Sequence, residues 1–370
     1  MNDMEVFLKA EIAKISGLNE VAMQAAKLKQ MKLAKPPESL GRLEELSIQL
    51  AGITGEVINN PIKKRVVVLC ADNGVVDEGV SSAPRSVTLA QAINMTKGLT
   101  GVGVLCSHFG AELQVVDMGI MAEYDCSKIL DRRIAFGTGN IAKDAAMTRE
   151  MAVQAVLTGI ELSNLAATDG VKILGVGEMG IGNTTTSAAV LSSLTGMTAE
   201  SLVGRGGGVN DEGFFRKKEI VKDAIHRLKP DMTDPLDVLS KVGGFDIAAM
   251  TGVFLGAAIN RIPVVIDGYI SAVAALCAYR LCAASREFMI PSHKSCEAGY
   301  AVAMDELKMR PILMLDMRLG EGSGCPLVFG IIEAACSVMQ NMASFETAGI
   351  DDNYLDEIRN EERYTDRGEL

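Results

Sequence analysis

Short, mainly apolar runs alternate along the chain with longer stretches in which apolar residues recur at helical spacing. Residues 65–71 read RVVVLCA, and further short runs lie at residues 112–117, 171–174 and 262–267. Continuous β-branched runs are typical of strands buried on both faces of a parallel sheet. Because helical stretches separate these runs, the pattern predicts an α/β protein with one doubly wound parallel sheet.

Two amphipathic helices are predicted before the first strand. The helical spacing extends from residue 3 to residue 32, and the segment Lys35-Pro-Pro37 ends it, since a residue that precedes proline disfavours the helical conformation. Ser39 is a suitable N-cap for a second helix, which ends at Gly52. Both helices precede every strand, so they indicate an appended helical unit.

The composition excludes several classes of partner. The formal net charge is −11, from 36 basic and 47 acidic residues, which argues against nucleic acid or an anionic membrane. No signal-peptide pattern and no membrane-length apolar window occur, so we expect a cytoplasmic protein. The eight cysteines form no CxxC pair and there are only three histidines, so no metal site is expected.

The most informative stretch is residues 175–187, GVGEMGIGNTTTS. It follows an apolar run and leads into a predicted helix at residues 188–194. Glycines that open a helix leave backbone N–H groups free at the positive end of the helix dipole, where a phosphate binds well. The stretch therefore predicts a phosphate-binding turn, and Glu178 lies within it.

Glu178 and Glu321 share one setting, because glycines flank each carboxylate at a predicted strand-to-helix turn. A ligand that closes over such a carboxylate removes water and raises its pKa toward the range of a general base. Either residue could instead cap the helix that follows. Asp72 and Asp267 also lie at strand ends, which favours a site at this edge of the sheet.

The same stretch also satisfies the dinucleotide pattern G-x-G-x-x-G through Gly175, Gly177 and Gly180, with Glu200 about 20 residues further on. That pattern requires its acid at the end of a strand, whereas Glu200 lies at the start of a predicted helical turn. A dinucleotide-dependent oxidoreductase remains a weaker alternative. No G-x-x-x-x-G-K-[ST] motif occurs, so a P-loop is excluded.

Taken together, several segments resemble the nicotinate-nucleotide–dimethylbenzimidazole phosphoribosyltransferase family. They lie in one order between residues 33 and 345, which is more specific than any single motif. The segments are KPPESLGRLE at 35–44, CADNGV at 70–75, EGV at 78–80, GEMGIGNTT at 177–185, KVGGFD at 241–246, DG at 267–268, PSH at 291–293 and RLGEGSG at 318–324.

This resemblance implies transfer of phosphoribose from nicotinate mononucleotide to an aromatic acceptor, without a metal or an organic cofactor. It implies a Rossmann-like sheet with a small helical domain built from both termini. We therefore expect a large α/β substrate-binding domain at 60–330 and a small helical domain at 1–59 with 331–370. The family works as a dimer, with sites near the subunit interface.

The resemblance also assigns the site residues. Glu321 is the expected general base, and Glu178 is the second carboxylate and the alternative base. The nucleotide is expected to contact Gly180, Asn183, Thr184, Gly204, Gly206, Lys217, Asp267, Gly268, Ser295 and Arg318. The aromatic acceptor is expected to contact Asn73, Ala83, Gln91, Met179, Met317 and Leu319. From the residues alone, Lys217 and Arg318 fit a solvated or ion-paired role equally well.

Two positions depart from the family pattern in the loop expected to form the acceptor pocket. Asn73 stands where the family usually has His, and Ala83 stands where a Ser commonly precedes Pro84. A benzimidazole, a purine or a phenol such as p-cresol therefore remains open as acceptor. Phenol-using members can pair two related subunits, so either a homodimer or a heterodimer is expected.

A rival hypothesis is a non-catalytic nucleotide-binding subunit that only completes the site of its partner. The presence of both Glu178 and Glu321 argues against it.

Overall fold

The computed structural model of the protein describes residues 3–355. Residues 1–2 and 356–370, which fall in the predicted small helical domain, lie outside the described residues.

The described residues form a six-stranded parallel sheet in the order β3-β2-β1-β4-β5-β6. Its strands are β1 (Lys64–Ala71), β2 (Glu112–Gly119), β3 (Ile129–Asp131), β4 (Ile173–Met179), β5 (Val264–Ile266) and β6 (Met289–Pro291). This is the strand order of the Rossmann fold. The predicted doubly wound parallel sheet is confirmed, although the sequence analysis did not foresee the three-residue strands β3 and β6.

The strand order reverses beside β1, which pairs with β2 on one side and β4 on the other. All eight residues of β1 and all seven of β4 are buried, as their apolar sequences require of central strands. Ligands bind outside the carboxyl ends of the strands at such a reversal. Glu178 pairs in register with Leu69, so it lies close to that edge.

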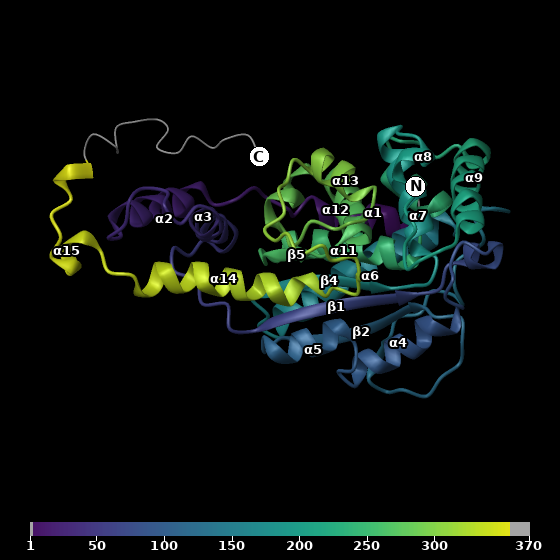
Figure 1. Ribbon diagram of the computed structural model, residues 1–370, viewed down its shortest axis with the longest axis horizontal. Coiled ribbons are helices and arrows are strands. Elements are labelled where there is room, and N and C mark those ends of the chain that lie inside the picture. The colour runs from purple at the N-terminus through teal and green to yellow at the C-terminus, as the bar shows by residue number, and fades with distance from the viewer. Residues whose placement is uncertain (1–2, 356–370) are drawn as a thin grey trace. The chain divides into compact units, whose positions relative to one another are not determined.

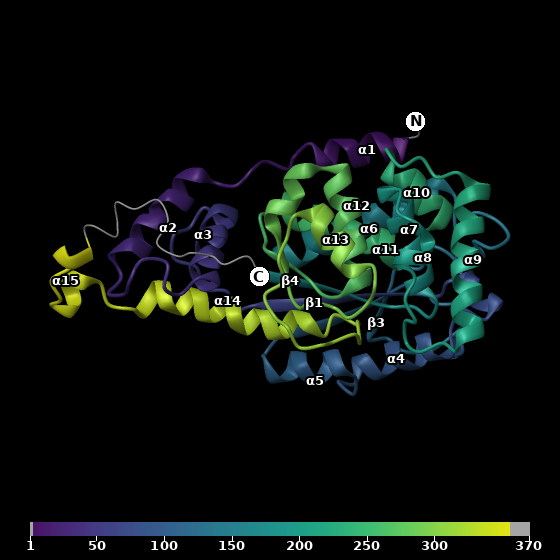
Figure 2. The same ribbon diagram turned by 45° about the horizontal axis from the view of Figure 1, so that its top comes forward.

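Helices cover both faces of the sheet. On one face, α4 (Ser86–Thr96) and α5 (Gly101–His108) pack on β2, and on the other lie α6 (Arg149–Thr168) and α11 (Phe245–Ile259) (Figure 1). Figure 2 shows the same division after rotation. Further helices around this sheet are α1 (Asp3–Ile12), α7 (Asn183–Thr195), α8 (Ala199–Leu202), α9 (Asp211–Leu228), α10 (Pro235–Val242), α12 (Tyr269–Leu281) and α13 (Tyr300–Leu307), with 3-10 helices η1 (Gly74–Glu78) and η2 (Ala283–Phe288).

The chain divides into two compact units. The larger comprises the N-terminal stretch as far as Ser16 together with Lys63–Val328, and the smaller comprises Gly17–Ile62 and the chain from Phe329 onward. The smaller unit holds α2 (Glu20–Lys32), α3 (Arg42–Thr54), most of α14 (Gly324–Asn341), α15 (Phe345–Ala348) and η3 (Asn353–Leu355). This division differs from the expected one at the N-terminus, because α1 packs on α6 and α11 of the larger unit.

Two predicted helix boundaries were wrong. The single helix expected over residues 3–32 is two helices, because Asn19 caps a new one by accepting a hydrogen bond from the Ala22 N–H at 3.0 Å. The apolar spacing continued across the break and concealed it. The next helix begins at Arg42 rather than near Ser39, and its N-cap is Gly41, whose φ of 50° favours glycine.

Two glycines allow α6 and α11 to approach closely. A Cβ placed on Gly159 would lie 2.0 Å from the Ala249 carbonyl oxygen, and one on Gly252 would lie 1.9 Å from the Val156 carbonyl oxygen. These contacts are backbone to backbone, so no side chain can rotate away to relieve a clash. The spacing of the two helices therefore depends on the absence of a methyl group at both positions.

Substitution of Gly252 by Ala is expected to destabilise the protein. Forcing a methyl group into a packed interior costs about 1–3 kcal/mol, which outweighs the gain of up to ~1 kcal/mol in helix propensity. The melting temperature and the urea midpoint should both fall. Gly207→Ala is the matched control, since an added Cβ there meets no atom of the described residues within 4 Å. Equal stability of the two variants would contradict the prediction.

Candidate active site

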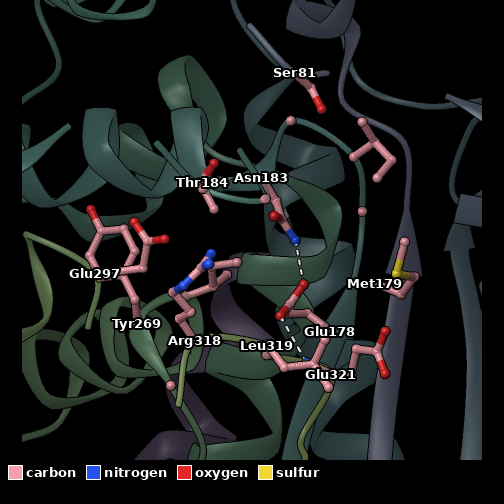
Figure 3. Close-up of a pocket in the computed structure, with 18 of the residues that line it drawn as sticks. Ser81, Glu178, Met179, Asn183, Thr184, Tyr269, Glu297, Arg318, Leu319 and Glu321 are labelled. Atoms are coloured by element: carbon pink, nitrogen blue, oxygen red, sulfur yellow. Dashed lines mark hydrogen bonds between the residues drawn. The ribbon is translucent and has the colours of Figure 1, made fainter. Parts of the chain in front are cut away.

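A cavity of about 230 Å³ opens at the carboxyl edge of the sheet. It is lined by segments that follow β1, β4 and β5, by a glycine-rich loop at residues 205–208, and by the loops at 295–297 and 318–321. Figure 3 shows Glu178, Asn183 and Glu321 around one part of this cavity, with Tyr269 and Glu297 around another. The fold thus brings together segments that are distant in the sequence.

The cavity gathers most of the residues expected from the sequence. Those that line it are Ala83, Gln91, Glu178, Met179, Gly180, Asn183, Thr184, Gly206, Asp267, Gly268, Ser295, Arg318, Leu319 and Glu321. Four expected residues do not line it: Asn73, Gly204, Lys217 and Met317. The Asn73 side chain is fully buried beside Gly180 and Gly244, so it lies behind the cavity wall and its contact with an acceptor stays a prediction.

Glu178 lies in a strand rather than in a turn, which corrects the sequence prediction. Strand β4 continues through Gly175 and Gly177 as far as Met179. The reason is a close approach: a Cβ on Gly177 would lie 2.4 Å from the backbone oxygen of Glu321. Glycine at this position marks the place where another backbone lies against the sheet.

Glu321 lies in a loop whose backbone is bound by two buried carboxylates. The Glu321 N–H donates to Glu178 Oε1 at 3.3 Å. The Gly322 N–H donates to Asp267 Oδ2 at 2.9 Å, and the Gly324 N–H donates to Asp267 Oδ1 at 2.7 Å. Acids at the ends of β4 and β5 thereby fix the loop.

The backbone of this loop is strained at Glu321. The φ angles of Gly320, Glu321 and Gly322 are 82°, 65° and 86°, a left-handed conformation that residues with a Cβ rarely adopt. Such a residue costs of order 1–3 kcal/mol and persists only where its surroundings hold it. Strain of this kind clusters at functional sites, and here it directs the Glu321 carboxylate.

Burial governs the protonation of the acids. Burial raises the pKa of Glu321. The hydrogen bond that Gln91 Nε2 donates to Glu321 Oε1 at 3.4 Å lowers this pKa and partly offsets the rise. Burial raises the pKa of Asp267 to about 7, although three backbone N–H groups oppose it. The pKa of Glu178 lies well above its usual range because of burial and of the Asp246 carboxylate. Glu321 Oε2 is buried without a hydrogen-bond partner among the described residues.

The turn predicted to bind phosphate begins at Gly180, immediately after β4. Gly182 is the N-cap of α7 with a φ of 93°, and the first turn of a helix leaves N–H groups for an anion. The second glycine loop reaches the same place, because a Cβ on Gly206 would lie 2.7 Å from Thr184 Oγ1. Two loops therefore form one side of the cavity around Thr184.

Lys217 lies directly behind this turn and is fully buried. Its Nζ donates to Thr184 Oγ1 at 2.7 Å and to the Gly204 carbonyl oxygen at 3.1 Å. Burial lowers the pKa of Lys217 to about 8. Among the described residues it forms no direct ion pair, and the Glu297 carboxylate opposes the fall in its pKa. The positive charge of this buried amine therefore lies against Thr184, which lines the cavity. This arrangement favours an anionic ligand at Thr184.

The cavity also contains residues that the sequence analysis missed. Tyr269, Glu297, Ser81 and Arg205 line it, and Asp246 binds Asn183 from behind. Tyr269 directly follows the strand-end pair Asp267-Gly268, and that position was a usable signal. Nothing in the sequence marked Glu297, which reaches the cavity because the loop after β6 folds toward Gly204.

Arg318 is exposed at the rim of the cavity, and within residues 3–355 its guanidinium forms no hydrogen bond or ion pair. Met317 is only partly buried, and its backbone oxygen accepts a hydrogen bond from the Cys296 N–H at 3.2 Å. Met317 therefore joins the 295–297 and 318–321 loops without lining the cavity.

Two further properties of the described residues bear on the site. No helix within residues 3–355 is long and apolar enough to cross a membrane. In the same residues, no group of three or more His, Cys, Asp or Glu side chains is placed to hold a metal ion.

The dinucleotide pattern proves incidental. Gly175 and Gly177 lie inside β4, and Glu200 lies in α8 rather than at the end of a strand. A Rossmann-type sheet with a glycine turn that opens a helix and a buried acid over one cavity is typical of α/β enzymes that bind nucleotides.

Comparisons with known proteins make this class specific. The chain matches the phosphoribosyltransferase family over residues 15–350. It is 51% identical to the nicotinate-nucleotide–dimethylbenzimidazole phosphoribosyltransferase of Clostridium perfringens, over 95% of this chain and 97% of that one. The enzyme of that name from Clostridium tetani is 48% identical, over 95% and 98% of the two chains.

A crystal structure of the corresponding enzyme from Thermus thermophilus superposes with a TM-score of 0.85 at 36% identity, covering 90% of this chain and 99% of that one. The chain therefore belongs to the nicotinate-nucleotide–dimethylbenzimidazole phosphoribosyltransferase family, and it is a phosphoribosyltransferase.

The buried Lys217 predicts a pH-dependent stability. Its pKa falls from 10.5 to about 8 on folding, which corresponds to on the order of 3 kcal/mol. The unfolded chain binds this proton more tightly, so Lys217 destabilises the protein below pH 8 and the penalty disappears between about pH 8 and 10.5.

Urea unfolding of wild type and of Lys217→Met at pH 7, 8.5 and 10 measures this effect. The free energy of unfolding of wild type, relative to the variant, should rise across the series. Lys222→Met, at an exposed position of the same helix, should show no such trend. A constant difference between wild type and Lys217→Met would contradict the prediction.

Proposed function

We propose that the protein transfers phosphoribose from nicotinate mononucleotide to an aromatic base, releasing nicotinate and forming an α-riboside 5′-phosphate for the lower ligand of cobamides. Its acceptor is dimethylbenzimidazole or a related benzimidazole, purine or phenol. The observation that carries the proposal is the pairing of the buried Glu321 carboxylate with a phosphate-binding turn across one cavity. Membership of the family supports the same reaction.

The reaction needs little beyond positioning and one base. The ring nitrogen of the bound nicotinate is cationic, so the bond from C1′ to that nitrogen breaks with its electron pair going to the ring. A lone pair on the acceptor forms the new bond to C1′, and Glu321 takes the proton that the acceptor loses. Holding both substrates in one cavity supplies much of the rate enhancement, and a positioned base adds typically 10²–10⁴-fold.

The nucleotide is assigned to the side of the cavity around Thr184. Its phosphate binds the first turn of α7 together with Gly206 and Ser295, and Lys217 supplies positive charge through Thr184. Arg318, which has no partner among the described residues, adds a second positive charge opposite the phosphate at the rim of the cavity. Both Asp267 oxygens already bind the Glu321 loop, so we assign Asp267 to holding that loop rather than to binding the ribose.

The acceptor is assigned to the opposite side, near Glu321. Ala83, Val87, Met179 and Leu319 offer apolar surface there, and Gln91 offers an amide. Flat aromatic ligands fit pockets of this kind, which combine apolar walls with a few polar groups. Because Ala83 provides no hydroxyl, acceptor recognition rests on Gln91 and Glu321.

We propose a homodimer as the working form. Leu319 lines the cavity but is 58% exposed, and a Cβ on Gly101 would lie 2.6 Å from it. The neighbouring Leu99, Val104 and Leu315 are also exposed. A second copy that covers this apolar surface would close the acceptor side. A non-catalytic subunit is disfavoured, because both glutamates are present in a formed cavity.

Substitution of Glu321 by Gln should leave nucleotide binding intact and lower kcat by roughly 10²–10⁴-fold, the usual contribution of a general base. Burial raises the pKa of Glu321, so wild-type activity should decline on acidification at a pH above the ordinary Glu range. In Glu321→Gln, this decline of activity at acidic pH should be absent. Steady-state kinetics as a function of pH measure both effects.

Glu219→Gln, on the exposed face of α9, is the control and should retain the wild-type profile. Wild-type rates in Glu321→Gln would remove Glu321 from the role of base.

The chain purified alone should form the α-riboside phosphate from nicotinate mononucleotide and dimethylbenzimidazole, and it should have the mass of a dimer. A parallel assay with p-cresol determines whether phenols are also accepted. Product analysis by mass spectrometry and light scattering measure these outcomes. Absence of product with both acceptors would contradict the proposed reaction, whereas activity that appears only with an added related subunit would contradict the homodimer.

A further inference from the structure

Two buried carboxylates share a single amide beneath the proposed active site. Asn183 Nδ2 donates one hydrogen bond to Glu178 Oε2 at 2.5 Å and another to Asp246 Oδ2 at 3.0 Å. Asp246 is fully buried and Glu178 is 7% exposed. The amide has only two N–H donors, so these two contacts use both. Asn183 therefore joins the acids without neutralising either.

No cation compensates this pair. Within residues 3–355 neither Glu178 nor Asp246 forms an ion pair. The ionisable groups that face them from the neighbouring strand ends are Asp72, Asp267, Glu321 and the thiol of Cys70. All of these are acidic. Arg85 lowers the pKa of Asp72 but pairs with Asp77, and the exposed Arg318 at the cavity rim forms no ion pair with either acid. Two adjacent buried carboxylates cannot both ionise at low cost in such a setting.

The other side chain against Asp246 is also neutral. A Cβ on Gly244 would lie 2.4 Å from Asp246 Oδ1 and 2.8 Å from Asn73 Oδ1. A Cβ on Gly180 would lie 2.9 Å from Asp246 Oδ2 and 3.2 Å from Asn73 Nδ2. The Asn73 amide thus lies alongside the Asp246 carboxylate, and neither of its polar atoms has a partner among the described residues. An amide cannot supply the missing positive charge.

Glu178 is also the residue that holds the Glu321 backbone. Its Oε1 accepts the Glu321 N–H, while its Oε2 is bound to Asn183 and, through Asn183, to Asp246. The chain of contacts from Asp246 to Asn183, Glu178 and the Glu321 backbone is therefore continuous. Figure 3 shows its part from Asn183 through Glu178 to Glu321. A change in charge at Asp246 would reach the proposed base along it.

We propose that Asp246 is a positioning residue: Asp246 and Glu178 hold one proton between them across Asn183, which keeps Glu178 uncharged and attached to the Glu321 backbone. Burial raises the pKa values of both acids, that of Asp246 to about 6, and a like charge adds to each rise, from Asp246 at Glu178 and from Asp72 at Asp246. Glu178 then serves as a neutral clamp, and Glu321 remains the acid that ionises. The proposal deepens the proposed function, but its first test does not depend on the reaction.

Infrared spectroscopy of the full chain tests the shared proton directly. Wild type should show the carbonyl band of a protonated carboxylic acid at neutral pH, and the Glu178 contribution should be absent from Glu178→Gln. In Asp246→Asn the band should titrate at a pH lower by about one unit or more, because a like charge has been removed. Carbonyl bands from Asp72 and Asp267 are present in wild type and in every variant, so they cancel when the spectrum of a variant is subtracted from that of wild type.

An unchanged titration midpoint in Asp246→Asn would overturn the proposal, as would a band that Glu178→Gln does not diminish. Asp246→Ser is a second uncharged substitution, should Asp246→Asn fail to fold, and thermal melting establishes folding for each variant. Asp223→Asn, an exposed carboxylate on α9, is the matched control and should leave the midpoint unchanged.

A double-mutant cycle tests whether Asp246 acts through Glu178. In the wild-type background, Asp246→Asn should lower kcat and shift the pH at which activity declines on acidification. In the Glu178→Gln background, the same substitution should have little effect. Coupling on the order of tenfold in kcat is within the range for contacting groups. Additive effects would overturn the positioning role while leaving the reaction itself intact. If the wild-type protein itself showed no phosphoribosyl transfer, the proposed function would be contradicted. The infrared test of the shared proton would still be valid.

Discussion

The attachment of one loop to two strand ends is the interaction on which the site depends. Carboxylates at the ends of β4 and β5 accept three backbone N–H groups from residues 321–324. These bonds hold Glu321 in a left-handed conformation that it would otherwise leave. Asp267 accepts two of these bonds at 2.7 and 2.9 Å, and Glu178 accepts the third at 3.3 Å. The ends of β4 and β5 thus determine where the proposed base lies.

Close backbone approaches make this attachment possible. The loop reaches β4 only because Gly177 has no side chain. In the same way, a Cβ placed on Gly180 would lie 2.3 Å from the Ala71 carbonyl oxygen. The same principle brings α6 and α11 together at Gly159 and Gly252. These four glycines therefore mark places where rigid elements touch.

The sequence was informative about the fold and about the chemistry of the site. Continuous apolar runs predicted the central strands, because burial on both faces imposes that pattern. The sequence misled where three-dimensional contact overrides local preference. Gly175 and Gly177 looked like a turn, yet they lie in β4. The partner that requires glycine at position 177 lies far along the chain at Glu321. Asp72 and Asn73 follow β1 at the edge where ligands bind, yet both side chains are buried and neither lines the cavity, and no local signal in the sequence marks this.

The buried Lys217 couples ligand binding to proton uptake. In the free protein burial lowers the pKa of Lys217 to about 8, whereas a phosphate seated at Thr184 would favour the charged amine and raise that pKa. Binding above pH 8 would then draw a proton from solution. The observed heat of binding would depend on the ionisation enthalpy of the buffer, and affinity would weaken as alkalinity increases. A residue that never contacts solvent would in this way make the enzyme responsive to the pH around it.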